Sequence, residues 1–218
     1  MKKFLCLAAA ALAAVTLFCG CSKSQNVDYS TYVSEKRENI YSYADDDLNF
    51  TVYYGVREQP FEADGVRGEL FRFAEARVKF TKTPSEVLID IDGAGGEMNY
   101  NAVECNFSLN FPDPQFGGDA LDVILTVDGR QRKINVQSVL YEGVMECDRA
   151  LDCVKEYAKD LFSSLTERGV FNAEIFVRLL FDDGCYYYVG VCDRQHNIHA
   201  YLVDGVRGKI IAEKKLSK

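Results

Sequence analysis

The chain has 218 residues and a formal net charge of -8, with 48% hydrophobic residues, 12% aromatic residues and no tryptophan. An acidic chain is a poor candidate for nucleic-acid binding, because that binding depends on Lys and Arg side chains that neutralise phosphates. The abundance of apolar and aromatic residues argues against long disorder and is enough for one large core or two smaller ones.

The N-terminus has the pattern of an export signal. Lys2 and Lys3 give it a positive start, and a mainly apolar run of about 15 residues follows from Phe4 to Phe18. This run is shorter than the roughly 20 residues that a membrane-spanning helix needs. Residues 1–20 are therefore predicted to be a signal peptide that is removed.

A cysteine motif follows the apolar run. In Leu17-Phe18-Cys19-Gly20-Cys21 a small residue stands directly before a cysteine, and this resembles the lipobox of bacterial lipoproteins. The resemblance implies a diacylglycerol on the Cys21 thiol, cleavage before Cys21, and a protein held by lipid on the extracytoplasmic face of the cell membrane. Phe18 stands where Leu is usual, and Cys19 is unusual beside Gly20. An ordinary secretory signal is the alternative.

Changes in residue pattern divide the mature chain into three parts. We predict a tether with an N-terminal arm or helix over 21–47, a β-sandwich over 48–141, and an α+β domain over 142–218. The first domain is expected to be antiparallel and of immunoglobulin-like size, and the second to be a small helix-plus-antiparallel-sheet (α-β-β-β-β) unit. The predicted fold class is α+β, mostly β.

The predicted sandwich depends on residues that alternate between apolar and polar. Val103, Cys105, Phe107, Leu109 and Phe111 form the clearest series, which predicts a strand with these five side chains inward. The alternation over 71–80 slips once, as a β-bulge would allow. Asp128-Gly129 lies between two strand-like runs, which is a strong signal for a hairpin.

The last part begins with helical periodicity. Apolar residues recur every 3.6 positions from Cys147 to Leu165, which predicts an amphipathic helix of about six turns that Gly169 ends. Strand-like runs follow at 173–181, 185–192, 198–203 and 209–212. The order of helix and strands, with the hairpin pattern of 200–204 and 208–211, resembles PepSY and cystatin-like extracytoplasmic domains. The resemblance implies a unit that binds or restrains a partner.

Five cysteines remain after Cys6, Cys19 and Cys21 are set aside, and an odd number cannot pair completely. Cys185 and Cys192 are seven residues apart on one predicted strand and should face opposite ways. We therefore expect buried free thiols.

The sequence offers one weak group of candidate metal ligands. Cys192, His196 and His199 lie close together in the chain, but their spacing matches no standard zinc motif, so an ordinary polar hairpin is the preferred interpretation. No cofactor is expected.

Catalytic motifs are missing, while an aromatic cluster suggests binding. The sequence has no Gly-x-Ser-x-Gly or Ser-x-x-Lys motif, although a carboxylate pair of an envelope hydrolase is not excluded by sequence. On a strand, Tyr186 and Tyr188 face one way and Tyr187 the other. Tyr186 and Tyr188 either pack against the sandwich or form a contact surface. We expect a non-catalytic binding or interaction module whose partner is an envelope protein or cell-wall component; an uncharacterised hydrolase is the alternative.

Overall fold

The computed structural model describes residues 27–217, so the predicted signal peptide and Cys21 lie outside the described residues. The protein is mostly β, with 55% of residues in strands and 11% in helices, and a large antiparallel sheet nearly closes into a barrel. This confirms the predicted predominance of β structure. Between residues 27 and 217, no helix has the length and apolar character needed to cross a membrane.

The first half of the chain is built almost entirely of strands. A short 3-10 helix, η1 (Tyr29–Tyr32), leads into them. They are β1 (Val33–Ala44), β2 (Leu48–Glu58), β3 (Leu70–Phe80), β4 (Val87–Ile91), β5 (Ala94–Glu97), β6 (Asn99–Asn101), β7 (Asn106–Pro112), β8 (Ala120–Val127) and β9 (Arg130–Ser138).

The second half places its helices before a run of antiparallel strands. The helices are α2 (Cys147–Tyr157) and α3 (Lys159–Ser164), followed by a small hairpin of β10 (Thr166–Glu167) and β11 (Val170–Phe171). The strands of the meander are β12 (Ala173–Phe181), β13 (Cys185–Asp193), β14 (Ile198–Asp204) and β15 (Ile210–Leu216). Their positions match the four runs that the sequence predicts.

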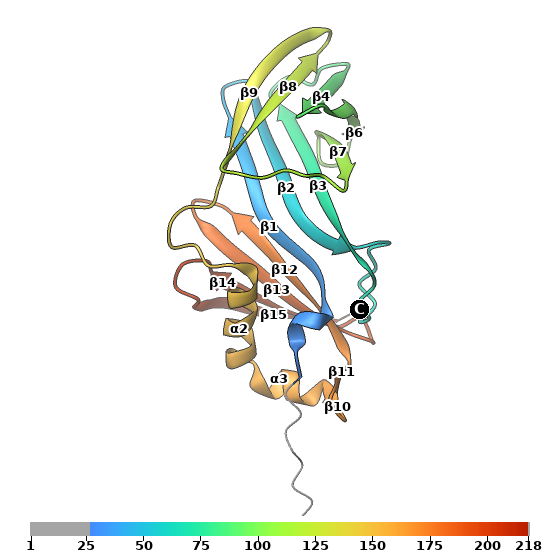
Figure 1. The fold of residues 1–218 in the computed structure, drawn as a ribbon, viewed down its shortest axis with the longest axis vertical. Coiled ribbons are helices and arrows are strands. Elements are labelled where there is room, and N and C mark those ends of the chain that lie inside the picture. Colours follow the sequence, from blue (N-terminus) through green and yellow to red (C-terminus); the bar gives the residue numbers. More distant parts are fainter. Residues whose placement is uncertain (1–26, 218) are drawn as a thin grey trace, which may run out of the picture.

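Strand β1 joins the two halves into one sheet. It pairs with β2 and β9 in antiparallel fashion and with β12 in parallel fashion. The main path of the sheet therefore runs β15-β14-β13-β12-β1-β2-β3-β7-β6. Figure 1 shows β1 crossing the molecule between the helices at one end and β4, β8 and β9 at the other. The sheet is continuous across residue 141, where the sequence predicts a domain boundary.

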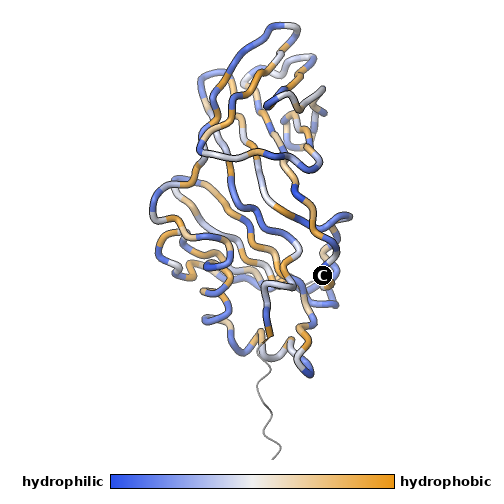
Figure 2. The backbone as a smooth tube through the Cα atoms, in the orientation of Figure 1, coloured by the Kyte–Doolittle hydropathy of each residue, from blue (hydrophilic) through white to orange (hydrophobic). Residues whose placement is uncertain are grey.

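Two apolar cores lie along this sheet. One packs β2 and β3 against β4 and β8, with Phe50, Val52, Ile89 and Leu125 nearly inaccessible to solvent. The other packs α2 against β12, β13 and β14. Apolar and polar residues alternate along the strands in Figure 2, as expected where one face of a sheet is buried.

Several local predictions need correction. Val103 and Cys105 are exposed, because Asn101 Oδ1 accepts the backbone N–H groups of Val103 and Glu104 and makes a turn before β7 begins at Asn106. Asp128-Gly129 does form the hairpin, with φ of 46° and 79°, as a type I′ turn requires.

The predicted bulge in β3 is absent, and the helix predicted from Cys147 to Leu165 is divided into two helices. The β2–β3 register is unbroken, and Phe73 faces the opposite side of the sheet from Ala74. The helical region divides at Ala158, whose φ of −107° and ψ of 38° are not helical. Gly169 does not end a helix, because it occupies the β10–β11 turn with φ of 81°.

The close approach of β1 and β2 generates a prediction about Gly55. A Cβ atom there would lie 2.0 Å from Lys36 O, so Gly55→Ala must push the two strands apart. We expect the free energy of unfolding to fall by about 2 kcal/mol or more. Urea unfolding followed by circular dichroism measures this change.

Gly117→Ala is the matched control, because a Cβ at Gly117 meets nothing within 4 Å. If both variants are as stable as the parent protein, the strands do not approach as closely as described.

Candidate functional site

Tyr186, Tyr187 and Tyr188 on β13 divide between the two faces of the sheet. Tyr187 is 1% exposed and points to the helical side, where its hydroxyl donates to Met145 O over 2.5 Å. Tyr186 and Tyr188 are half-buried on the other face. The guanidinium of Arg178 lies 5.8 Å from the centre of the Tyr188 ring.

The face that carries Tyr188 holds a row of arginine and aromatic residues, which we call the arginine face. Register places Tyr188, Arg178, Arg37, Gly55 and Phe73 side by side across β13, β12, β1, β2 and β3. Neighbouring residues in such a row share one face of the sheet. Arg57 lies two residues after Gly55 on β2 and Arg77 four residues after Phe73 on β3, so both point to the same face as the row. This face therefore carries four guanidinium groups, those of Arg37, Arg57, Arg77 and Arg178.

Each guanidinium lies near an aromatic ring. Arg37 is 4.3 Å from the centre of the Tyr53 ring, and Arg57 is 4.4 Å from that of Phe73. Arg77 lies 5.4 Å from the centre of the same Tyr53 ring. Such contacts contribute about 0.5–1 kcal/mol each at exposed sites, and they hold the guanidinium groups in place.

A buried carboxylate anchors the centre of the arginine face. The Glu35 side chain is 5% exposed, and its Oε2 accepts a hydrogen bond from Arg178 Nη2 over 2.6 Å. Glu35 Oε1 lies 4.0 Å from Arg37 Nη2. Burial lowers the pKa of Arg37, and the charge of Glu35 opposes that shift. The buried Nε atoms of Arg37 and Arg178 have no hydrogen-bond partner among the described residues, so this cluster keeps unused donors.

The segment 59–69 between β2 and β3 borders the arginine face. Phe61 on this segment packs edge-on against Phe176, with ring centres 5.7 Å apart. Gly65 N–H donates to Glu174 Oε1 over 2.8 Å. Gly65 has φ of 85°, and a Cβ there would lie 2.6 Å from Arg194 N, so the segment fits closely against the β13–β14 turn.

The candidate metal ligands are not brought together. Cys192 and His199 lie on opposite faces of the sheet, because Cys192 pairs with Ile198 while His199 pairs with Val191. His196 Nδ1 lies 3.0 Å from Ala63 O and so contacts the segment 59–69. Within residues 27–217, no three His, Cys, Asp or Glu side chains form a group that could hold a metal ion.

All five cysteines within residues 27–217 are free, and most of them are buried, which makes their thiols unreactive. Cys185 and Cys192 face opposite ways and are both buried, as the spacing predicts. Burial raises the pKa of Cys147 to about 12 and that of Cys192 to about 11. Cys105 is exposed, contrary to the prediction of buried thiols. The buried thiols are therefore poor nucleophiles near neutral pH.

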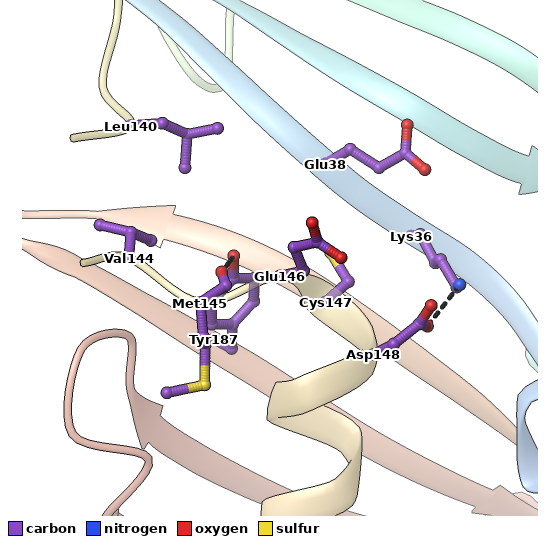
Figure 3. Close-up of a pocket in the computed structure, with 9 residues that line it drawn as sticks. All are labelled: Lys36, Glu38, Leu140, Val144, Met145, Glu146, Cys147, Asp148 and Tyr187. Atoms are coloured by element: carbon purple, nitrogen blue, oxygen red, sulfur yellow. Dashed lines mark hydrogen bonds and ion pairs between the residues drawn. The ribbon is translucent and has the colours of Figure 1, made fainter. Parts of the chain in front are cut away.

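A pocket of about 260 Å³ lies on the opposite face of the sheet, where the two halves of the chain meet. We call it the junction pocket. Figure 3 shows its lining from β1, the connection before α2, the start of α2, and β13. Its polar side chains are those of Lys36, Glu38, Glu146 and Asp148, and Lys36 Nζ lies 2.5 Å from Asp148 Oδ1.

Neither the arginine face nor the junction pocket was predicted from the sequence, although the sequence contains part of the pattern that forms the arginine face. The arginine face needs β1 beside β12, and nothing in a sequence indicates that parallel pairing. Reading the second face of β2 and β3 would have shown Tyr53, Arg57, Phe73 and Arg77 at even spacings. The junction pocket depends on the loop before α2, which has no regular pattern.

Comparisons with protein-family models, curated proteins and solved structures give no match for this chain.

Glu174, which holds the segment 59–69, generates a pH prediction. Glu174 is buried, and its Oε2 has no partner among the described residues. Burial raises the pKa of Glu174 above 4.5, and the nearby carboxylates of Glu58 and Asp64 add to the shift. The folded protein therefore binds a proton more readily than the unfolded chain, and the free energy of unfolding falls as pH rises above about 4.5.

Glu174→Gln removes this dependence and keeps an acceptor for Gly65 N–H. We expect the variant to gain stability relative to the parent protein at about pH 7, with the difference shrinking at about pH 4. Urea unfolding at both pH values measures it, and exposed Glu69→Gln is the control. A variant that is less stable by the same amount at both pH values would contradict the expected pKa shift.

Proposed function

We propose that this chain is a lipid-anchored protein of the bacterial cell envelope that binds an acidic partner through its arginine face. The protein acts by binding and is not catalytic. The proposal depends on the arrangement of four guanidinium groups over aromatic rings on one face of the sheet. The lipid on Cys21, implied by the lipobox, holds the protein on the extracytoplasmic face of the membrane.

Charge supports an acidic partner. The protein has a formal charge of -8, and removal of Lys2 and Lys3 with the signal makes the mature chain more negative still. The arginine face has an excess of positive charge, because its four guanidinium groups outnumber the three carboxylates that pair with them, those of Glu35, Glu75 and Glu104. Charge complementarity of this kind selects partners and speeds their association.

Aromatic groups at the edge of the arginine face support binding as well. Phe61 is 37% exposed and Phe71 is 43% exposed, and Phe71 is the cross-strand neighbour of Arg57. Arginine and aromatic side chains are the residues most often found at the energetic centre of interfaces. Carboxylates of a partner can bind the guanidinium groups while its apolar parts cover these rings.

We also propose how the fold divides into two units. We propose a β-sandwich over 48–141 and a PepSY-like or cystatin-like unit over 142–218 that restrains a partner. The packing of α2 on β12, β13 and β14 supports the second unit.

The alternative function is that of an envelope hydrolase. The two histidines do not support it, since neither one hydrogen-bonds a Ser, Thr or Cys side chain within residues 27–217.

Lipidation is tested by the location of the protein in a bacterial host. Cys21→Ser removes the thiol that would carry lipid, so we expect the protein to move from the membrane fraction to the soluble extracytoplasmic fraction. Fractionation and immunoblotting measure this shift. Cys19→Ser is the matched control and should stay in the membrane fraction. If Cys21→Ser also remains there, the lipoprotein assignment is wrong.

Partner binding is tested with a fluorescent decaglutamate peptide and residues 22–218. The row from Tyr188 to Phe73 crosses five strands and is about 19 Å long, which this extended peptide can span. We expect Arg57→Gln with Arg77→Gln to weaken binding about tenfold, or about 1.4 kcal/mol, because two charged donors are lost. Fluorescence anisotropy measures the dissociation constant, which should also rise with salt.

Arg149→Gln with Arg207→Gln is the control, since both residues are exposed and lie outside the arginine face. Equal weakening by the two double variants would show that only overall charge matters. No binding of the peptide at all would remove the support for an acidic partner.

A further inference from the structure

The junction pocket lies on the face of β1 opposite the arginine face. Lys36 pairs in register with Val177, whose side chain lies in the core beneath α2, so Lys36 points to the helical side. The β1–β2 register shifts between Arg37 and Asn39, which makes Glu38 the extra residue of a β-bulge. Bulges redirect a side chain from its regular position, and here the redirected carboxylate lines a pocket.

The walls of the pocket are apolar on one side. Leu140, Val144 and Met145 line it from the connection before α2, and the ring of Tyr187 completes the lining from β13. The hydrogen bond from the Tyr187 hydroxyl to Met145 O fixes this connection against the sheet. An aliphatic group in the pocket would therefore meet a wall that is already in place.

The other side of the pocket is acidic. Glu38, Glu146 and Asp148 contribute three carboxylates, and Lys36 is the one basic side chain in the lining. Lys36 is engaged by Asp148. Within residues 27–217, the carboxylates of Glu38 and Glu146 form no ion pair. Two negative charges therefore remain available beside the apolar wall.

The helix start does not cancel this charge. The N-terminus of α2 carries about half of an elementary positive charge, which opposes a cation. Three carboxylates exceed the sum of one ammonium group and this half charge. The buried thiol of Cys147 responds to the same excess, because the charge of Glu38 adds to the effect of burial in raising its pKa.

Size limits the ligand. A volume of about 260 Å³ equals that of roughly eight or nine water molecules in the liquid. This space suits a molecule with a few carbon atoms and one charged group. A pocket with an apolar wall and a few placed polar groups is the usual form of a small-molecule site.

We propose that the junction pocket binds a small organic cation, a primary ammonium on a short aliphatic chain. The ammonium lies between Glu38 and Glu146, and the chain lies along Leu140, Val144 and Met145. This site is independent of the acidic partner, since it lies on the other face of the sheet.

Two methionines make the test direct. Residues 22–218 contain only Met98 and Met145, so a protein with ¹³C-labelled methionine methyl groups gives two NMR signals. Met145 lines the junction pocket, while Met98 is 3% exposed in the other core and serves as an internal reference. Met145→Leu assigns the signals. The probe is pentylammonium, with neutral pentanol and anionic pentanoate as analogues of similar size.

We expect pentylammonium to shift the Met145 signal in a saturable manner and to leave the Met98 signal unchanged. Pentanol and pentanoate should bind at least about tenfold more weakly. Glu38→Gln with Glu146→Gln should weaken pentylammonium binding about tenfold, because both free carboxylates are lost. Glu142→Gln, an exposed residue outside the lining, should change it less than about twofold.

Three results would overturn the proposal. Equal binding of pentylammonium and pentanol would identify an apolar pocket without selectivity for charge. An unmoved Met145 signal would show that the pocket takes no such ligand. Unchanged binding by the double variant, with the Met98 signal showing that it remains folded, would place the ammonium elsewhere.

Discussion

The pairing of β1 with both β2 and β12 is the constraint on which the rest of the structure depends. Among the described strands, the β1–β12 pair is the only link between the two halves of the long sheet path, and β1 has β12 parallel on one side and β2 antiparallel on the other. A parallel neighbour cannot be reached by a tight turn, and here the whole chain from β2 to β11 lies between β1 and β12. Displacing β1 would separate the two cores and leave the edges of both sheets exposed.

Both proposed sites follow from the alternation of side chains along β1. Glu35 and Arg37 point to one face and organise the arginine face, while Lys36 points to the other and lines the junction pocket. The bulge at Glu38 adds a second pocket residue within the same short stretch. One strand thus places a mainly cationic surface and an acidic pocket back to back, separated by the thickness of the sheet.

Ion pairs and aromatic contacts hold the charged part of β1 in place, although residues 35–38 include no hydrophobic side chain. Glu35 is buried beside two guanidinium groups, and the ring of Tyr53 lies near Arg37 while that of Phe176 lies near Arg178. A buried charge is tolerated only when it is paired, and these pairs meet that condition. Gly55 allows the backbone of β2 to approach Lys36 O, which keeps the pairs close together.

Much of the fold could be predicted because most strands carry an apolar face and end in recognisable turns. The four strands from β12 to β15 and the Asp128-Gly129 hairpin are examples. β1 could not be predicted as a strand, because residues 35–38 are charged on both faces and so lack an apolar period. The assignment of Val103 and Cys105 failed because the side chain of Asn101 holds a turn there, against the apparent alternation.

The candidate sites were less predictable than the strands. The division of Tyr187 from Tyr186 and Tyr188 follows from alternation alone and required no tertiary information. The arginine face joins residues from five strands, some of them as far apart in sequence as Arg37 and Arg178, and register alone brings them together. The grouping of Cys192 with His199 by sequence proximity ignored the same alternation, which sends them to opposite faces.

Native-state hydrogen exchange of residues 22–218, measured by mass spectrometry at increasing urea concentrations, tests most directly whether β1 unites the two halves. Because β1 lies between β2 and β12, the amides of β1, β2, β12 and β13 should exchange together, with one free energy of opening and one dependence on urea. The contradicting result is that β12 and β13 remain protected at urea concentrations where β1 and β2 have already exchanged. That result would mean that the halves fold separately and that β1 does not hold the two sites on one sheet.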